Sequence, residues 1–245
     1  MARALRLVTF NIHHGVGADG LLDLERIASV IDETGADVVC LQEVDRHWGA
    51  RSGFVDQPAW LAGRLSVHAA YGANVDLDPP VPGAPRRGYG MATLSAFPIR
   101  HRVHTLLMRP LGGEQRGLLE VSLDIDGRIL RVLNTHLEYG SQVERLEQAA
   151  AIAGAVTDGP APVVLLGDLN AGPSSPEVAR LSDVLSDAWD TAGVGSGFTF
   201  DAVSPHRRID YVMVGNGVAV GSAHVLPTHA SDHRPVVVDA LLDDA

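Results

Sequence analysis

The sequence contains no lysine, and all 19 of its basic residues are arginine. The formal net charge at pH 7 is −11. Proteins that bind duplex DNA gain much of their affinity from lysine and arginine side chains that neutralise phosphates. An acidic chain without a long basic run is therefore a poor candidate for general DNA binding. Local basic patches remain open around Arg86 and Arg87, or around Arg207 and Arg208.

Cysteine is almost absent, since Cys40 is the only one. An internal disulfide and a cysteine-based metal site are therefore excluded. Cys40 lies in the apolar run 37–41, which predicts a buried side chain that behaves as a small hydrophobe.

Long apolar runs and a signal-peptide pattern are also missing. No run approaches the roughly 20 residues that span a bilayer, so the expected location is cytoplasmic. The 245 residues, 46% hydrophobic and 20% charged, fit a single domain over 1–245 that is large enough to bury a substantial core.

Apolar periodicity predicts mixed secondary structure. Asp126-Gly127 is a strong signal for a type I′ hairpin. Strands are expected at 5–12, 37–42, 91–95, 118–125, 128–133, 163–170, 209–214, 218–226 and 235–242. Helices are expected from Asp23 to Gly35, around Trp60, from Ser141 to about Val156, and after Ser175-Pro176, with a long loop over 74–90. Hairpins mixed with strand–helix units favour two packed, mixed β-sheets flanked by helices.

The stretch 163–170 is an apolar strand that runs into Gly167-Asp168-Leu169-Asn170. A buried strand ending in polar residues usually places them in a crevice where ligands bind. Gly, Asp and Asn are also common turn formers. Taken alone, the motif leaves both interpretations open.

Other predicted strands end in the same kind of residue. One such strand end is unremarkable, but five or six imply a polar crevice where the two sheets meet. The residues concerned are Asn11 with His13 and His14, Glu43, Asn134 to His136, Asp168 with Asn170, Asp210, and Asp232 with His233.

These segments carry a family resemblance, because they occur in one order from end to end of the chain. The sequence resembles the endonuclease/exonuclease/phosphatase family, which includes deoxyribonuclease I-like nucleases, apurinic endonucleases, inositol-polyphosphate phosphatases and bacterial sphingomyelinases. The resemblance implies a four-layer α/β sandwich and divalent-metal-dependent cleavage of phosphate esters. The segments that carry it are Thr9–Asn11, Leu41–Glu43, Tyr89–Ser95, Asn134–Leu137, Gly167–Asn170, Arg208–Tyr211 and Ser231–Pro235.

Glu43 is the expected direct ligand of the metal. Mg²⁺ usually takes one or two protein carboxylates together with water and phosphate oxygens. Asn11 and Asp232 would complete or orient that shell, and Mn²⁺ is the alternative ion. The metal would polarise a phosphoryl oxygen and stabilise the leaving oxyanion.

The resemblance also implies roles for the remaining polar residues. Asp168 would activate or align the attacking water, and Asn170 would help to hold the phosphate. His233 would contact the phosphate while Asp210 orients its ring. His136 would donate a second hydrogen bond to the phosphate. A neighbouring carboxylate is expected to favour the imidazolium form of these rings.

Arginines are the remaining candidates for substrate binding, since their planar fork suits phosphate oxygens. Arg116 and Arg51 are the two candidates, whereas Arg145 is expected on a solvated helix face. The roles of His13 and His14 stay open at the rim of the expected crevice.

The sequence therefore predicts a Mg²⁺- or Mn²⁺-dependent phosphoesterase that acts on a small or lipid-derived phosphodiester. One alternative is a nuclease of the same family, with local arginines contacting the nucleic-acid backbone. Another is a non-catalytic binding protein on the same fold, which degenerate residues at Glu43, Asp168 or His233 would have supported. The sequence leaves the substrate and the oligomeric state open.

Overall fold

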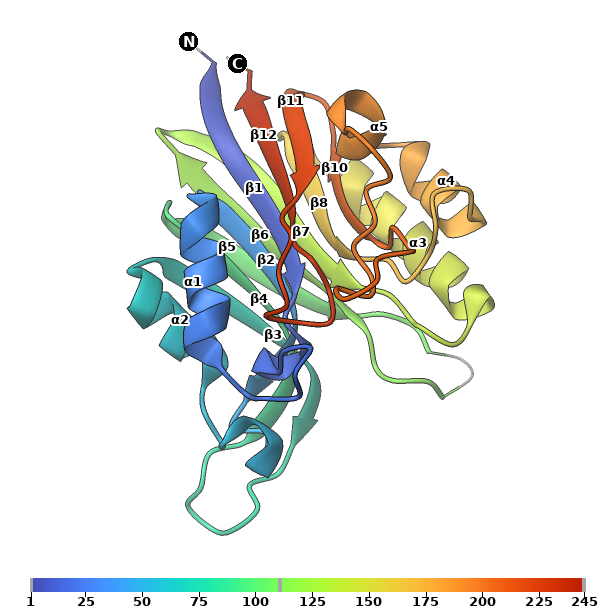
Figure 1. Ribbon diagram of the computed structural model, residues 1–245. Helices are drawn as coiled ribbons and strands as arrows, with labels where there is room; N and C mark the ends of the chain where they lie inside the picture. The colour runs from blue at the N-terminus through green and yellow to red at the C-terminus, as the bar shows by residue number, and fades with distance from the viewer. Residues whose placement is uncertain (1, 110–111, 244–245) are drawn as a thin grey trace.

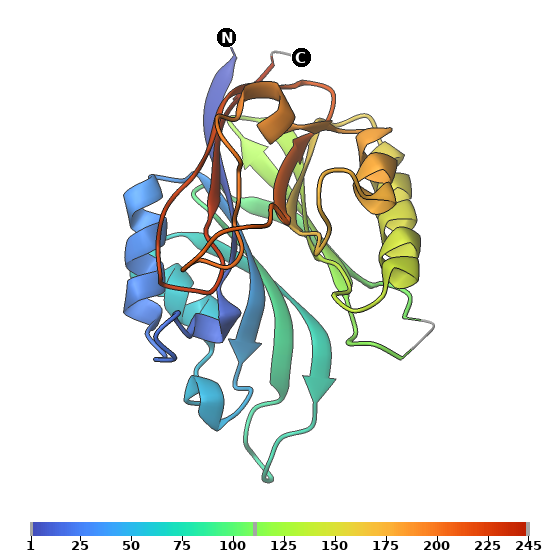
Figure 2. The ribbon, with the colours of Figure 1, turned by 45° about the vertical axis from the view of Figure 1, so that its right-hand side comes forward.

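Two six-stranded sheets pack face to face, and helices cover their outer faces (Figures 1 and 2). The computed structural model describes residues 2–109 and 112–243. The expected four-layer α/β sandwich is confirmed. None of the helices in these ranges combines the length and apolar character needed to cross a membrane.

The first sheet has β1 and β2 near its centre as a parallel pair, and its other neighbours are antiparallel. Its strands, in spatial order, are β11 (Val218–Val225), β12 (Val236–Leu242), β1 (Arg3–Asn11), β2 (Val38–Arg46), β4 (Arg87–Ser95) and β3 (His68–Leu77).

The second sheet has β7 and β8 as its parallel pair. Its strands, in spatial order, are β5 (Ile99–Leu106), β6 (Gly117–Ile125), β7 (Arg128–His136), β8 (Val163–Asp168), β10 (Asp210–Val214) and β9 (Ser186–Asp187).

The helices form the two outer layers (Figure 2). Helices α1 (Leu24–Thr34) and α2 (Gln57–Leu65) cover the first sheet, and α3 (Gln142–Thr157) and α4 (Pro176–Ser182) cover the second. The short α5 (Ala188–Ala192) packs against β10 and β11. Two 3₁₀ turns, η1 (His13–Gly15) and η2 (Ala50–Ser52), follow β1 and β2.

Apolar side chains fill the space between the sheets, with separate apolar clusters under each helical layer. Cys40 belongs to the cluster between the sheets and is fully buried, as expected. Burial raises the pKa of its thiol to about 12, so the side chain is a packing group and not a nucleophile.

Local signals placed several element ends correctly. The Asp23 carboxylate accepts the Arg26 N–H at the start of α1, and Gly35 ends that helix in the left-handed region. Asp126 and Gly127 both have positive φ, as a type I′ turn requires. The Ser141 hydroxyl caps α3 by accepting the Glu144 N–H.

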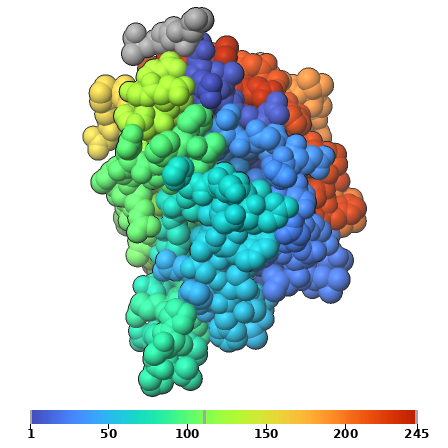
Figure 3. All heavy atoms as spheres, turned by 90° about the vertical axis from the view of Figure 1, so that its left-hand side faces the viewer, coloured from blue at the N-terminus to red at the C-terminus, as the bar shows by residue number. Residues whose placement is uncertain are grey.

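The prediction of a long loop over 74–90 was wrong at both ends of the loop. Strand β3 continues to Leu77 and β4 begins at Arg87, so the connection spans only 78–86 and protrudes at one end of the molecule (Figures 1 and 3). The Pro and Gly residues of 79–83 suggested a loop, but the flanking residues pair in an antiparallel ladder. Strands β3 and β5 were not expected, since several of their residues are charged or small.

Candidate active site

The polar strand ends converge at one edge of the two sheets. His136 and Asp210 are both register partners of Asp168, on the parallel neighbour β7 and the antiparallel neighbour β10. Because opposite residues in paired strands point to the same face, the three side chains project together. Two of them, His136 and Asp168, line a pocket of about 380 Å³ together with Glu43, His233 and Asp232, among others.

Gly167 allows this convergence. A Cβ atom at Gly167 would lie 2.1 Å from the carbonyl oxygen of Thr135 on β7, a separation that no side chain tolerates. The glycine of Gly-Asp-X-Asn is therefore required for the close approach of β7 and β8 beside Asp168.

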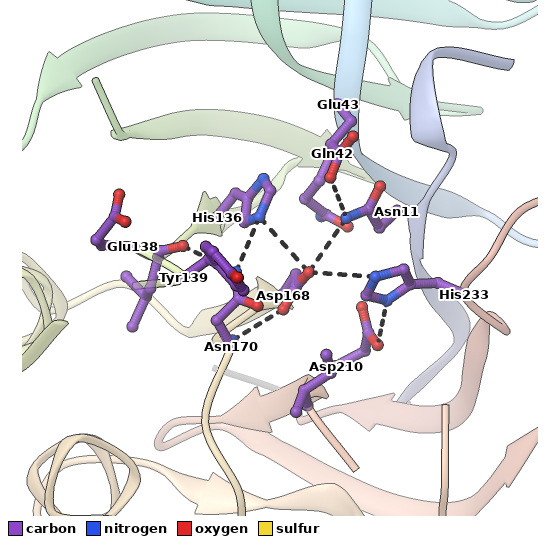
Figure 4. A network of polar contacts seen from close by, with 12 residues as sticks. Asn11, Gln42, Glu43, His136, Glu138, Tyr139, Asp168, Asn170, Asp210 and His233 are labelled. Carbon is purple, nitrogen blue, oxygen red and sulfur yellow. Dashed lines mark hydrogen bonds and ion pairs between the residues drawn. The ribbon is translucent and has the colours of Figure 1, made fainter. Parts of the chain in front are cut away.

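Asp168 lies at the centre of the polar network (Figure 4). Its Oδ2 accepts a hydrogen bond of 3.1 Å from the Asn11 amide, and its Oδ1 accepts the Asn170 N–H at 2.8 Å. The side chain is 1% exposed. Burial and the neighbouring Asp210 carboxylate raise the pKa of Asp168 to about 7. A carboxylate with a pKa near neutrality is suited to accept a proton.

His233 lies beside Asp168 and is held by Asp210. Its Nδ1 is 2.9 Å from Asp210 Oδ2, and its Nε2 is 3.7 Å from Asp168 Oδ2. Burial alone would lower the pKa of His233, but the charges of Asp210 and Asp168 together with the hydrogen bond to Asp210 raise it to about 10. The imidazolium form expected from the sequence therefore applies to this ring.

His136 is different, and the expected imidazolium form is wrong for it. Burial, the Arg116 guanidinium and the charged His233 hold the pKa of His136 well below its usual value. Arg116 Nη1 lies 3.1 Å from His136 Nδ1. The ring's Nε2 lies 3.1 Å from the Asn170 amide nitrogen and 3.5 Å from Asp168 Oδ2. Because the guanidinium and the amide nitrogen can only donate, and a neutral imidazole accepts through one nitrogen, the ring accepts from either Arg116 or Asn170.

Glu43 approaches the same network from the first sheet. The pairing of β2 with β4 shifts register between Leu41 and Val44, and Glu43 has a φ of 57° within this bulge. Bulges re-aim side chains, and this one coincides with a glutamate that lines the pocket. Asn11 donates to Glu43 Oε1 at 3.0 Å and thereby bridges Glu43 and Asp168.

The residues expected to hold a metal fit a hard cation. Glu43 and Asp232 both line the pocket and are only half-buried, and Asn11 lies between the sheets beside Glu43. Carboxylate and amide oxygens are the donors that Mg²⁺ and Mn²⁺ prefer. The Asn11 side-chain oxygen accepts the His13 N–H at 3.1 Å, so Asn11 presents its NH₂ group to Glu43 and orients that carboxylate.

The two candidate substrate arginines lie in different places. Arg116 lines the pocket and is 6% exposed, but its guanidinium is paired with Glu114 at 2.7 Å. Arg51 is not among the described residues of the pocket lining. Its guanidinium makes two hydrogen bonds to the buried Asp45 and lies over the Trp48 ring.

Several pocket residues were not predicted as site residues. Phe200 packs against the His233 ring at 4.9 Å between centroids, and Tyr139 is 74% exposed. These side chains come from loops without periodic patterns, so no local signal identifies them. The remaining members of this group are Tyr89, Glu114, Arg207 and Ile209.

The sequence is similar to those of known proteins. A sequence profile described as "Endonuclease/Exonuclease/phosphatase family" matches residues 8–233. Protein cwh43 of Schizosaccharomyces pombe is 31% identical over 159 residues, which are 64% of this chain and only 15% of that protein. The chain therefore spans a small part of the length of that relative.

Solved structures agree with this match. An endonuclease/exonuclease/phosphatase from Beutenbergia cavernae is 32% identical with a TM-score of 0.85, over 99% of this chain and 72% of that one. A mannosyl-6-phosphatase of Bacteroides thetaiotaomicron has a TM-score of 0.79 at 18% identity, over 96% and 99% of the two chains. The second likeness concerns the fold alone.

Proposed function

Since the chain belongs to the endonuclease/exonuclease/phosphatase family, whose members hydrolyse phosphate esters with a divalent metal, we propose that it is a phosphodiesterase that acts on a small or lipid-derived phosphodiester. The observation that carries the proposal is the position of Asp168. This buried carboxylate has a pKa of about 7 and lies between two histidines of opposite character, near Glu43.

Each residue of the network has a task in this proposal. Asp168 accepts the proton of the attacking water. The His233 imidazolium, held by Asp210, donates to the phosphate and offsets its growing negative charge. The neutral His136 donates a second hydrogen bond to the phosphate, and Asn170, whose amide nitrogen lies 3.1 Å from the ring, holds the phosphate beside it. When bound by Glu43, with Asn11 and Asp232, Mg²⁺ or Mn²⁺ supplies Lewis-acid polarisation of a phosphoryl oxygen.

The pocket walls favour a small or lipid-derived substrate. Tyr139 and Phe200 contribute aromatic side chains to the lining, where they could contact the group attached to the phosphate. Of the two arginines among the described lining residues, Arg116 is already paired with Glu114. Binding of duplex DNA calls for many phosphate contacts, which an acidic chain with this lining does not offer. The cytoplasmic location and the single domain stay predictions.

A substrate panel tests the proposal. Metal-free protein is assayed with Mg²⁺, Mn²⁺ or Ca²⁺ on bis(4-nitrophenyl) phosphate, 4-nitrophenyl phosphate, phosphodiester lipids, sugar phosphates, DNA and RNA. Asp168→Asn is assayed beside Asp183→Asn, a matched change at an exposed aspartate of the second helical layer. We expect metal-dependent cleavage of diesters that only Asp168→Asn abolishes. Cleavage confined to nucleic acids would instead support a nuclease, and inactivity on every substrate would support a binding protein.

A further inference from the structure

His13 and His14 lie at the rim of the pocket and have no task in the proposed reaction. Both belong to η1, directly after β1, and both side chains are half-buried. Their ring centroids are 4.5 Å apart, with an angle of 72° between the ring planes. One ligand atom from each ring and one carboxylate oxygen of Glu43 all lie within 4.8 Å of one another.

The backbone of both histidines has an unfavourable conformation. His13 has a φ of 44° and His14 a φ of 45°, in the left-handed region that residues other than glycine rarely adopt. The turn is held by the Gln57 amide, which donates to the His14 carbonyl at 2.7 Å, and by the His13 N–H bond to Asn11. Backbone strain of this kind concentrates at functional sites.

The ring nitrogens also lack partners. The Nδ1 atoms of His13 and His14 are both buried and make no hydrogen bond within the described part of the chain. The nearest acidic atom to His13 Nδ1 is Asp232 Oδ1 at 3.8 Å, beyond hydrogen-bond distance. Buried polar atoms are normally paired, so two adjacent unpaired nitrogens suggest a ligand that no protein atom replaces.

We propose that His13, His14 and Glu43 form a second cation site, for a borderline transition-metal ion such as Zn²⁺, Co²⁺ or Mn²⁺. Two imidazoles and one carboxylate are typical ligands of these ions, whereas Mg²⁺ prefers oxygen. Metal–nitrogen bonds of about 2.0–2.1 Å require the ligand atoms to lie closer than 4.8 Å. Half-buried rings can rotate to close that distance.

The proposed site shares Glu43 with the expected Mg²⁺ shell of Asn11, Glu43 and Asp232. It differs from that shell in its two histidine ligands. Binding at the second site does not depend on hydrolysis. A protein that hydrolyses nothing could still bind Zn²⁺ there, so the two proposals fail separately.

The test is titration of metal-free protein with Co²⁺, followed by visible absorption, and with Zn²⁺ and Mg²⁺ by calorimetry. The variant is His13→Asn/His14→Asn, because asparagine tolerates positive φ and removes the imidazole nitrogens. The matched control is His101→Asn/His224→Asn, at two exposed histidines on strands β5 and β11. Asp168→Asn serves as a second comparison, because it changes the other described group that could hold an ion, Asp168 with Asp210 and His233.

Wild type, the matched control and Asp168→Asn should bind Co²⁺ and Zn²⁺ at least about tenfold more tightly than the double variant. Mg²⁺ affinity should be similar in wild type, the matched control and the double variant. Equal Co²⁺ and Zn²⁺ affinity in the double variant would overturn the proposal. If that variant does not fold, electron spin-echo spectroscopy of Mn²⁺-loaded wild type decides. Coupling from two histidine nitrogens supports the site, because the other described group that could hold an ion, Asp168 with Asp210 and His233, contains only one. Coupling from one histidine or none overturns it.

Discussion

The two walls of the pocket differ in burial, although the same sandwich supports both. We define the buried wall as His136, Asp168 and His233, together with Asp210, which bonds to His233; all four are 5% exposed or less. We define the open wall as Glu43 and Asp232, which are half-buried, with the half-buried His13 beside Asp232. Burial shifts the pKa of Asp168 upward and that of His136 downward, whereas the adjacent carboxylates outweigh burial and raise the pKa of His233. The buried wall is suited to proton transfer, and the open wall leaves oxygen atoms accessible to an ion that keeps water ligands.

The largest effect is expected at the centre of the buried wall. Asp168→Asn should lower kcat/KM roughly 10³-fold, because it removes the proton acceptor. The variant should remain folded, since asparagine keeps the shape and loses a carboxylate that burial disfavours. Steady-state kinetics and thermal melting check both expectations. Full activity in a folded variant would show that the proton acceptor lies elsewhere.

On the open wall, Glu43→Gln should lower activity at least about 100-fold at low metal concentration. The loss should shrink as Mg²⁺ is raised, because an amide oxygen is a weaker ligand than a carboxylate. Activity measured across a Mg²⁺ titration separates this from a proton-transfer role. An activity loss that stays constant at saturating Mg²⁺ would show that Glu43 is not a metal ligand.

His233, in the buried wall, should control stability at alkaline pH. Its pKa rises from 6.5 in the unfolded chain to about 10 in the fold, so the charged ring stabilises the fold fully below about pH 6.5. That contribution, on the order of a few kcal/mol, is lost as pH rises through 10. Urea unfolding from pH 7 to 10 should show a steeper decline for wild type than for His233→Gln. Parallel declines would contradict the prediction. The absence of lysine leaves few other groups that titrate in this range.

The smallest effect on activity is expected outside both walls, at Arg51. Arg51→Met should change kcat/KM by less than about tenfold, since the guanidinium is bonded to Asp45. It should lower the free energy of unfolding by about 1–3 kcal/mol, because the buried Asp45 carboxylate loses its partner. A large rise in KM without loss of stability would restore Arg51 as a substrate-binding residue.

Much of the fold was predictable because its signals are local. Asp23, Ser141 and Asp126-Gly127 act on backbone groups a few residues away, so sequence is enough to place them. Ser175 shows the limit of such reasoning. Its expected position before α4 is correct, but its hydroxyl bonds to the Gly172 carbonyl and does not cap the helix. Strands β3 and β5 were not predicted, because their own apolar residues do not alternate clearly. Hydrogen-bonded pairing with β4 and β6 defines these strands.

The order of apolar and polar residues along the chain indicates which side chains can meet. Polar residues flank the apolar strands, which predicts one polar crevice that holds Asn11, Asp168 and Asp210. The protonation state and orientation of these and the neighbouring side chains depend on tertiary contacts. The charge of an imidazole depends on every group within a few ångströms, and only the fold places Arg116 against His136 and two carboxylates against His233. The bulge that aims Glu43 into the pocket likewise exists only where β2 pairs with β4.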